Sequence, residues 1–260
     1  MKNENKMLRG KNIVVMGVAN KRSIAWAIAK ALSTAGAKLA FTYQDERFKD
    51  KVKRLVDKEM PGSLLLPCNV AEDGELDNLA ARLKDEWGVV HSLVHSLAYA
   101  KKEELDGLYA DTSREGFLLA HNISAYSLVA AAQRLYPLMS EGGTIITLTF
   151  QGSQRVVPNY NVMGVAKASL EASVRYLASD LGPQKIRVNA ISAGPIKTLS
   201  AKGVKDFNRL LEGVAERTPL RSLATADDVA ATALFLASDL SRAITGTVLY
   251  ADCGYHIMAT

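Results

Sequence analysis

The chain has 260 residues, of which 48% are hydrophobic and 23% are charged, an ordinary balance for one α/β domain with a sizeable core. No uncharged apolar run approaches the roughly 20 residues of a membrane span, and the polar first eight residues lack the pattern of a targeting leader, so we expect a cytoplasmic protein. Acidic residues are interspersed with the basic ones despite a formal charge of +5, which disfavours nucleic acid as a partner. The two cysteines and four histidines form no ligand pattern, so we expect no metal.

Short β-rich runs alternate along the chain with longer helical runs, as a parallel sheet with crossover helices requires. We predict strands over residues 13–16, 39–43, 64–66, 92–96, 144–149, 187–192 and 248–251. Helices are predicted over residues 23–35, 47–58, 72–87, 113–138, 160–181 and 225–238. Most strand runs are apolar without strict alternation, which is typical of strands covered on both faces. The pattern predicts an α/β fold in one doubly wound, Rossmann-like domain spanning residues 1–260, with a polar tail over residues 1–8.

The first predicted strand runs into a helix through the turn GVANKRSIA, which is not a GxGxxG motif. Gly17 would let the chain leave the strand, and Ser23 stands where a residue caps the following helix. Its hydroxyl and the first helical N–H groups could hold a pyrophosphate at the positive helix end. A plain helix cap explains the same residues, so this turn by itself leaves both interpretations open.

The second predicted strand ends in FTYQDER, where a dinucleotide-binding fold usually meets the adenosine ribose. Gln44 is neutral and Asp45 is negative, a pair that would repel a 2′-phosphate and favours NADH. Arg47 and Arg22 keep NADPH as an alternative, because an arginine is the residue that a 2′-phosphate would need.

Tyr160 and Lys167 stand seven residues apart at the start of the longest predicted helix, in PNYNVMGVAKASLEASVRYLASDLG. Seven residues make about two helical turns, so both side chains leave the same face. A phenol that donates to an oxygen gathering negative charge, beside an ammonium that fixes a cofactor, favours reduction of a carbonyl-conjugated substrate. Packing plus a solvated charge is the alternative when the pair is taken alone.

These motifs together resemble the enoyl-acyl-carrier-protein reductases of bacterial fatty-acid synthesis, a divergent branch of the short-chain dehydrogenase/reductases. The resemblance covers nearly the whole chain, through GVANKRSIAWAIAKAL, FTYQDER, LPCNV, HSLAYA, GFLLAHNISAYS, PNYNVMGVAKASLEASVRYL, IRVNAISAGPIKTLSAKGVKDF, TPLR and ADCGYHI. Ordinary short-chain dehydrogenases have a glycine-rich first turn and a shorter step from tyrosine to lysine. The seven-residue step and the Ser-Ile pair therefore indicate the enoyl reductase branch.

The resemblance implies NADH as cofactor, an acyl carrier protein bearing a 2-enoyl chain as partner, and a homotetramer. It implies Tyr160 and Lys167 as catalytic residues and a substrate-binding lid over residues 195–215. The implied cofactor-binding residues are Gly17, Ser23, Ile24, Gln44, Asn69, Val70, Ser96, Leu97, Lys167, Ile196, Lys197, Thr198, Leu199 and Ser200. The implied substrate-binding residues are Ala98, Tyr99, Ala100, Phe150, Tyr160, Met163 and Phe207. By the same resemblance Asn122 would be a buried asparagine that satisfies backbone groups.

Three residues depart from the family pattern. Phe150 stands where the family usually has a second tyrosine, so it keeps an aromatic wall and lacks the hydroxyl. Asn69 replaces a usual aspartate, and Cys253 replaces a residue that is usually small or glycine. The implied reaction is hydride transfer from NADH to the β-carbon of a trans-2-enoyl thioester. A dehydrogenase acting on a carbonyl or hydroxyl substrate and a low-turnover cofactor-binding paralogue remain the alternatives.

Overall fold

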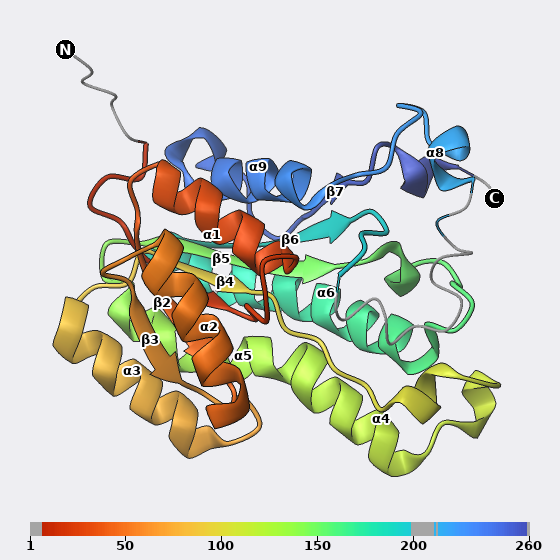
Figure 1. Cartoon of the computed structure of the whole chain (residues 1–260), viewed down its shortest axis with the longest axis horizontal. Helices are drawn as coiled ribbons and strands as arrows, with labels where there is room; N and C mark the ends of the chain where they lie inside the picture. The colour runs from red at the N-terminus through yellow and green to blue at the C-terminus, as the bar shows by residue number, and fades with distance from the viewer. Residues whose placement is uncertain (1–6, 199–210, 212, 259–260) are drawn as a thin grey trace.

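The computed structural model describes residues 7–198, 211 and 213–258, and within this part of the chain seven parallel strands form one sheet. The strand order is β3-β2-β1-β4-β5-β6-β7 (Figure 1). Chain order therefore reverses between β1 and β4, which is the switch point where doubly wound sheets bind ligands. The strands are β1 (Asn12–Met16), β2 (Lys38–Tyr43), β3 (Leu64–Pro67), β4 (Ser92–His95), β5 (Gly143–Thr149), β6 (Ile186–Ala193) and β7 (Val248–Ala251).

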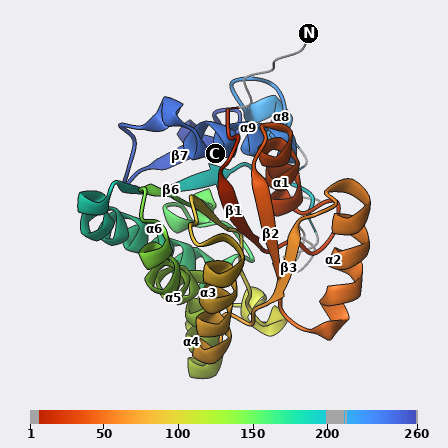
Figure 2. The ribbon, with the colours of Figure 1, turned by 90° about the vertical axis from the view of Figure 1, so that its left-hand side faces the viewer.

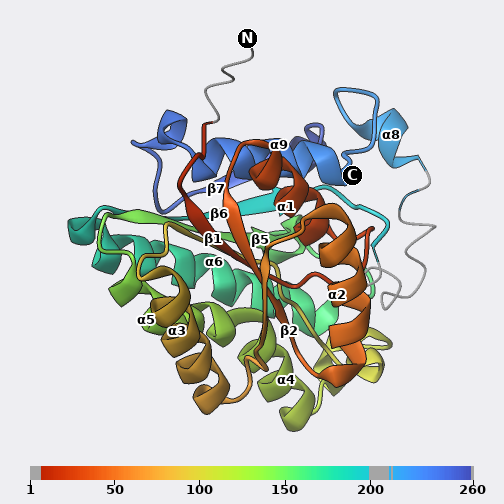
Figure 3. The same cartoon turned by 60° about the vertical axis from the view of Figure 1, so that its left-hand side comes forward.

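Helices cover both faces of the sheet (Figures 2 and 3). The α-helices are α1 (Ile24–Thr34), α2 (Glu46–Glu59), α3 (Asp73–Trp87), α4 (Arg114–His121), α5 (Ser127–Leu135), α6 (Asn161–Leu181), α8 (Val214–Arg217) and α9 (Ala226–Ala237). Short 3₁₀ turns occupy Lys102–Leu105, Tyr109–Asp111, Tyr136–Leu138, Gln151–Ser153, Gly182–Gln184, Asp239–Ser241 and Tyr255–Ile257. The predicted doubly wound fold is confirmed.

Two apolar cores lie on opposite faces of the sheet, because successive strand residues point to opposite sides. Val14 and Met16 pack into the core with α3, α5 and α6, whereas Ile13 and Val15 pack into the core with α1, α2 and α9. Strands enclosed in this way need apolar residues at consecutive positions. This accounts for the continuous apolar runs that predicted the strands within two residues of their observed ends.

The single helix predicted over residues 113–138 is wrong in its middle. The segment consists of α4, a π-helical stretch at Asn122–Tyr126, α5 and a 3₁₀ turn. Ser124 lies in the π-helical stretch, and its hydroxyl accepts from the backbone N–H of Tyr99 at 2.9 Å and donates to the Tyr99 carbonyl at 3.0 Å. An anchor outside the helix explains the local change of period, which sequence periodicity does not reveal.

The polar tail predicted over residues 1–8 is too long at its end. Leu8 is only 1% exposed and packs into the core beneath α1. Its backbone N–H donates to the carbonyl of Ala35 at 2.9 Å, so Leu8 is part of the packed domain. Within the described part of the chain, no helix combines the length and the apolar character that crossing a membrane would need.

Candidate active site

The backbone of the turn after β1 packs directly against the backbone at the end of β4. Gly17 has φ +95°, and a Cβ there would lie 1.9 Å from the carbonyl oxygen of Ser96. Only glycine fits this contact, both for space and for the left-handed backbone. The predicted cofactor residues Gly17 and Ser96 are thereby brought together at the switch point, with an open backbone surface of the kind that a dinucleotide contacts.

Ser23 does not cap α1 through its side chain, so this part of the prediction is wrong. It occupies the N-cap position, but no hydrogen bond joins its hydroxyl to the helix. Its Oγ instead accepts from the backbone N–H groups of Ala19 at 3.0 Å and Asn20 at 3.1 Å. Both lone pairs are used in shaping the turn, which leaves the hydroxyl proton to donate to an anion at the helix N-terminus.

At the end of β2, Gln44 is exposed and Asp45 caps α2 by accepting from the backbone N–H of Arg47 at 2.9 Å. The Arg47 guanidinium also pairs with the Asp45 carboxylate at 2.6 Å, and this hydrogen bond lowers the pKa of Asp45. Of the two arginines considered for a 2′-phosphate, Arg47 is therefore already bound to a carboxylate, whereas the exposed Arg22 has no such ion pair among the described residues. Half-buried Asn69, after β3, uses its amide oxygen to accept from the Ala71 N–H at 3.2 Å, and the second lone pair of that oxygen remains.

Lys167 lies inside α6 and is only 5% exposed. Its Nζ donates a 2.8 Å hydrogen bond to the carbonyl oxygen of Leu148, near the end of β5. Burial lowers the pKa of Lys167 to about 8, and the carboxylate of Glu171 opposes that shift. The amine is therefore mainly charged at neutral pH and lies near the strand ends, where a cation can hold ribose hydroxyls.

Tyr160 directly precedes α6 and is half-buried. Burial raises its pKa well above the ordinary value, with a further contribution from the charge of Glu171, so the phenol stays protonated and can donate. The Phe150 ring meets the Tyr160 ring edge to face, with 5.1 Å between centroids and an interplanar angle of 73°. A Cβ on Gly152 would come within 2.5 Å of the Tyr160 ring, so the loop after β5 packs directly against the tyrosine.

The predicted substrate residues partly converge beside Tyr160. Met163 is 5% exposed and forms a small apolar cluster with Ala100 and Tyr160 packed against it. Ala98 and Tyr99 are exposed, and the Tyr99 side chain retains 53% of its surface. The loop that follows β4 thus contributes Ala100 to the site, while the two preceding side chains face outward.

The role expected for Asn122 is wrong. Asn122 is half-buried, and its side chain makes no hydrogen bond to the described residues. Ser124, two residues further on, is fully buried and provides the backbone contacts that were expected of the asparagine. Small hydroxyl residues within apolar helices are common, which explains why the sequence pattern did not single out Ser124.

Two buried polar residues of the site were missed. His95, at the end of β4, is 0% exposed, with Nδ1 3.0 Å from Thr147 Oγ1 and Nε2 2.8 Å from Ser127 Oγ. Burial, aided by the charge of Lys167, lowers the pKa of His95 to about 3, so the ring is neutral. Glu171 is 6% exposed on α6. A charged residue within a helical sequence pattern is usually expected at the surface, so only the tertiary structure reveals that Glu171 is buried.

A cavity of about 410 Å³ lies on the outer side of Tyr160. It is lined by the loop after β5, by the first turns of α6 and by Tyr109. Val156 at its rim is 96% exposed. Tyr160 therefore contacts a hollow through which a chain-like substrate could approach.

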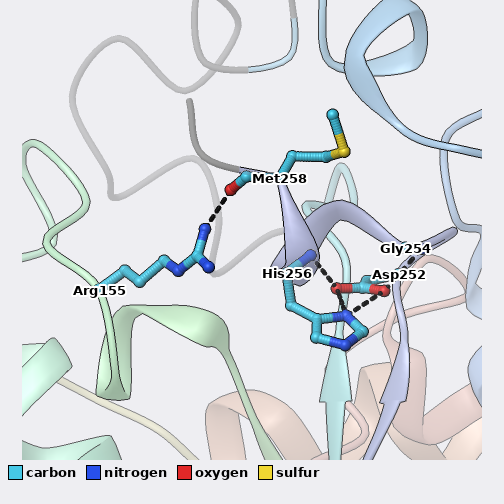
Figure 4. A network of polar contacts seen from close by, with 5 residues as sticks. All are labelled: Arg155, Asp252, Gly254, His256 and Met258. Carbon is cyan, nitrogen blue, oxygen red and sulfur yellow. Dashed lines mark hydrogen bonds and ion pairs between the residues drawn. The ribbon is translucent and has the colours of Figure 1, made fainter.

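The segment after β7 returns toward the loop that follows β5 (Figure 4). Asp252 is 5% exposed and accepts from the backbone N–H groups of Gly254 and His256, each at 2.9 Å. Its carboxylate also contacts the His256 ring nitrogen at 2.9 Å. Arg155 donates to the carbonyl oxygen of Met258, so the C-terminal segment is tied to the loop that packs on Tyr160.

Cys253 has a backbone explanation. Its φ is +58°, in the left-handed region that favours glycine. Its Sγ accepts a 3.4 Å hydrogen bond from Ser222, a contact that glycine could not make. The conformation explains why small residues or glycine suit this position.

Four of the remaining predicted residues pack against the two cores. Ile24 and Ile196 pack at the rim of one core, and Val70 and Leu97 at the rim of the other. Lys197 is exposed and Thr198 is half-buried. Leu199, Ser200 and Phe207, together with most of the predicted lid, lie outside the described residues. The described residues contain no group of three or more His, Cys, Asp or Glu side chains placed to hold a metal ion.

The fold and the site define a reductase of the short-chain dehydrogenase/reductase class. A family model described as enoyl-(acyl carrier protein) reductase matches residues 17–256. The Bacillus subtilis (strain 168) enoyl-acyl-carrier-protein reductase (NADH) FabI is 57% identical over 97% of this chain and 98% of its own length. The corresponding FabI of Escherichia coli (strain K12) is 48% identical over 97% of this chain and 96% of its own. The chain belongs to the enoyl-acyl-carrier-protein reductase family.

Two solved structures are similar to this one. A Bacillus cereus enoyl-acyl carrier protein reductase, solved with NADP+ and indole naphthyridinone, has a TM-score of 0.96 and 56% identity, covering 98% of this chain and 99% of that one. An Anaplasma phagocytophilum enoyl-acyl-carrier-protein reductase, solved with NAD, has a TM-score of 0.93 and 48% identity, covering 98% and 97%.

Replacing Lys167 by Met should remove a pH-dependent contribution to the stability of the unliganded protein. The folded pKa of about 8 lies below the ordinary value of 10.5. Between these values the unfolded chain binds more protons, so raising the pH favours the folded parent. We expect the parent to gain about 2–3 kcal/mol relative to Lys167→Met over this range. Urea unfolding across the range measures the gain, and parallel curves for the two proteins would contradict it.

Proposed function

We propose that the chain reduces the 2,3 double bond of trans-2-enoyl-acyl-carrier-protein with NADH, in fatty-acid elongation. The observation that carries this proposal is the pairing, at the start of α6, of a protonated phenol and a buried amine. Tyr160 directly precedes α6 and Lys167 lies within it, where its amine hydrogen-bonds the Leu148 carbonyl near the end of β5. Full-length similarity to reductases named for this reaction supports the same activity.

The residues present fit a dinucleotide. Gly17 leaves room where a Cβ would collide with Ser96, and Ser23 keeps a hydroxyl proton beside the N-terminus of α1. Asp45 places a carboxylate at the end of β2 and holds Arg47, an arrangement that favours NADH over NADPH. When bound, NADH supplies a hydride to the β-carbon of the enoyl thioester.

The chain's own residues stabilise the charge that hydride transfer creates. Negative charge develops on the thioester oxygen, and the Tyr160 phenol donates a hydrogen bond to it. Lys167 holds the ribose and adds positive potential. The apolar cluster around Met163 excludes water from one side of the reacting atoms, which strengthens both interactions. Water or a relay from Tyr160 then protonates the α-carbon.

The proposal includes a cytoplasmic homotetramer that receives its substrate from an acyl carrier protein. Large apolar side chains remain exposed on the helices expected to form the contacts: Leu118 at 60%, Tyr126 at 50% and Tyr176 at 75%. Closed two-fold symmetry would bury each against its own copy. Light scattering of the purified protein tests this assembly, and a stable monomer of 28.1 kDa would contradict it.

A comparison of substrates separates the proposed reaction from its alternatives. NADH oxidation with a short 2-enoyl thioester is expected, with much weaker activity toward a 3-oxoacyl thioester. Preference for the 3-oxoacyl compound would indicate a carbonyl reductase. Cofactor binding without either reaction would indicate a low-turnover paralogue.

Substitutions of the two catalytic residues should fail in different ways. Tyr160→Phe removes a donor that acts as the enolate forms, so it should lower kcat about a hundredfold or more and leave NADH affinity nearly unchanged. Lys167→Ala should mainly weaken NADH binding. Fluorescence titration and steady-state kinetics measure the two effects. Parent-like NADH affinity in Lys167→Ala would show that the role assigned to the lysine is wrong.

Phe150→Tyr should change kcat only a few-fold. The edge-to-face contact already positions the Tyr160 ring, and one neutral hydrogen bond contributes about 0.5–1.5 kcal/mol net. A hydroxyl that stabilised the enolate directly would instead raise kcat roughly a hundredfold. Kinetics with the same enoyl thioester distinguish the two, with Phe150→Leu as the control for loss of the ring.

A further inference from the structure

Glu171 is a buried carboxylate that the proposed reaction leaves without a role. It lies four residues after Lys167 on α6, so the two side chains share a helix face. Only 6% of its surface is exposed, close to the 5% of Lys167. Carboxylates are rarely buried to this extent unless they are paired or hydrogen-bonded.

The hydrogen bonds of Glu171 come from the loop after β5. Its Oε1 accepts from the hydroxyls of Thr149 at 2.7 Å and Ser153 at 2.5 Å. These two residues stand on either side of Phe150 in the sequence. One carboxylate oxygen thereby holds both ends of the turn that carries the aromatic wall.

The same turn determines where the Tyr160 ring can lie. Phe150 meets that ring edge to face. A Cβ on Gly152 would lie 2.5 Å from the Tyr160 ring, and a Cβ on Gly164 would lie 2.7 Å from the Gly152 carbonyl oxygen. Because the loop is in close contact with both the Tyr160 ring and α6, a more mobile loop would also leave the Tyr160 phenol less well positioned.

The charge of Glu171 acts on Lys167. Three titratable groups among the described residues interact with this amine or share its surroundings: Glu171 on α6, His95 on β4 and Tyr160 at the start of α6. His95 and Tyr160 are neutral at pH 7, because burial lowers the pKa of the first and raises that of the second. Of the three, Glu171 is the group whose charge raises the pKa of Lys167 and so opposes the effect of burial.

We infer that Glu171 is a positioning residue of the reductase: it keeps Lys167 charged for cofactor binding and holds the loop at residues 149–153 against Tyr160. The inference rests on the proposed function. It assigns the carboxylate two separable effects, one through its charge and one through its hydrogen bonds.

Glu171→Gln tests the charge, because it keeps the shape of the side chain. NADH affinity of the parent should fall as the pH rises through about 8, where the free amine loses its proton. In Glu171→Gln the midpoint of that loss should move down by about one pH unit. Fluorescence titration of NADH from pH 6 to pH 10 measures the midpoint without turnover.

Glu104→Gln is a matched control. Glu104 is 7% exposed and, like Glu171, accepts a 2.5 Å hydrogen bond from a serine, Ser113. The Glu104→Gln variant should lose NADH affinity with a midpoint at the same pH as the parent. A midpoint that Glu171→Gln leaves unchanged, or that Glu104→Gln shifts equally, would overturn the inference.

Ser153→Ala tests the hydrogen bonds, because it frees the far end of the loop while the Thr149 hydroxyl remains as a partner of the buried carboxylate. We expect kcat to fall at least about threefold, with the NADH midpoint and KM for NADH unchanged. A parent-like kcat in Ser153→Ala would overturn the positioning role, and this variant decides the question if Glu171→Gln does not fold. If the parent protein does not bind NADH, the proposed function itself is refuted. If the parent binds NADH and reduces the enoyl thioester, and the variants behave like the parent, only the inference is refuted.

Discussion

Burial of one amine constrains the groups around it. The Lys167 side chain leaves α6 and donates a hydrogen bond to the backbone carbonyl of Leu148 on β5. A hydrogen-bond acceptor and a nearby anion both favour the charged form of a desolvated amine. Glu171 supplies the anion. The same desolvation keeps His95 neutral, so no second positive charge competes, and it keeps the Tyr160 phenol protonated. One low-polarity environment thus holds a cation and a neutral hydrogen-bond donor, the two groups that the proposed reaction uses.

Close backbone contacts position these groups. Gly17 touches Ser96 where β1 and β4 adjoin, and Gly152 touches both Tyr160 and the helix residue Gly164. Such contacts leave no side chain to adjust, so the strand ends, the loop and the helix constrain one another's positions closely. The turn after β1 and the position of Tyr160 therefore depend on backbone contacts more than on flexible side chains.

The sequence predicted what repeats along the chain and missed what depends on distant contacts. Apolar runs located the seven strands of the described residues, and the helical pattern placed Lys167 inside α6 and put the start of that helix one residue early, at Tyr160. The π-helical stretch escaped notice because Ser124 is anchored to Tyr99, a contact between segments 25 residues apart. Ser23 was assigned to a helix cap when its hydroxyl serves the preceding turn. Glu171 resembled a surface charge because its partners lie 18 and 22 residues earlier in the chain.

Phe150 can be understood from these contacts. A tyrosine hydroxyl at this position could help to place the loop or could donate to the substrate. Placement of the loop is already provided by the hydrogen bonds of Thr149 and Ser153 to Glu171 and by the close approach of Gly152 to Tyr160. Donation to the enolate is available from Tyr160, which burial keeps protonated. Because both tasks have another provider among the described residues, we expect the missing hydroxyl to matter little. The contact that the Phe150 side chain makes is its edge-to-face packing on the Tyr160 ring.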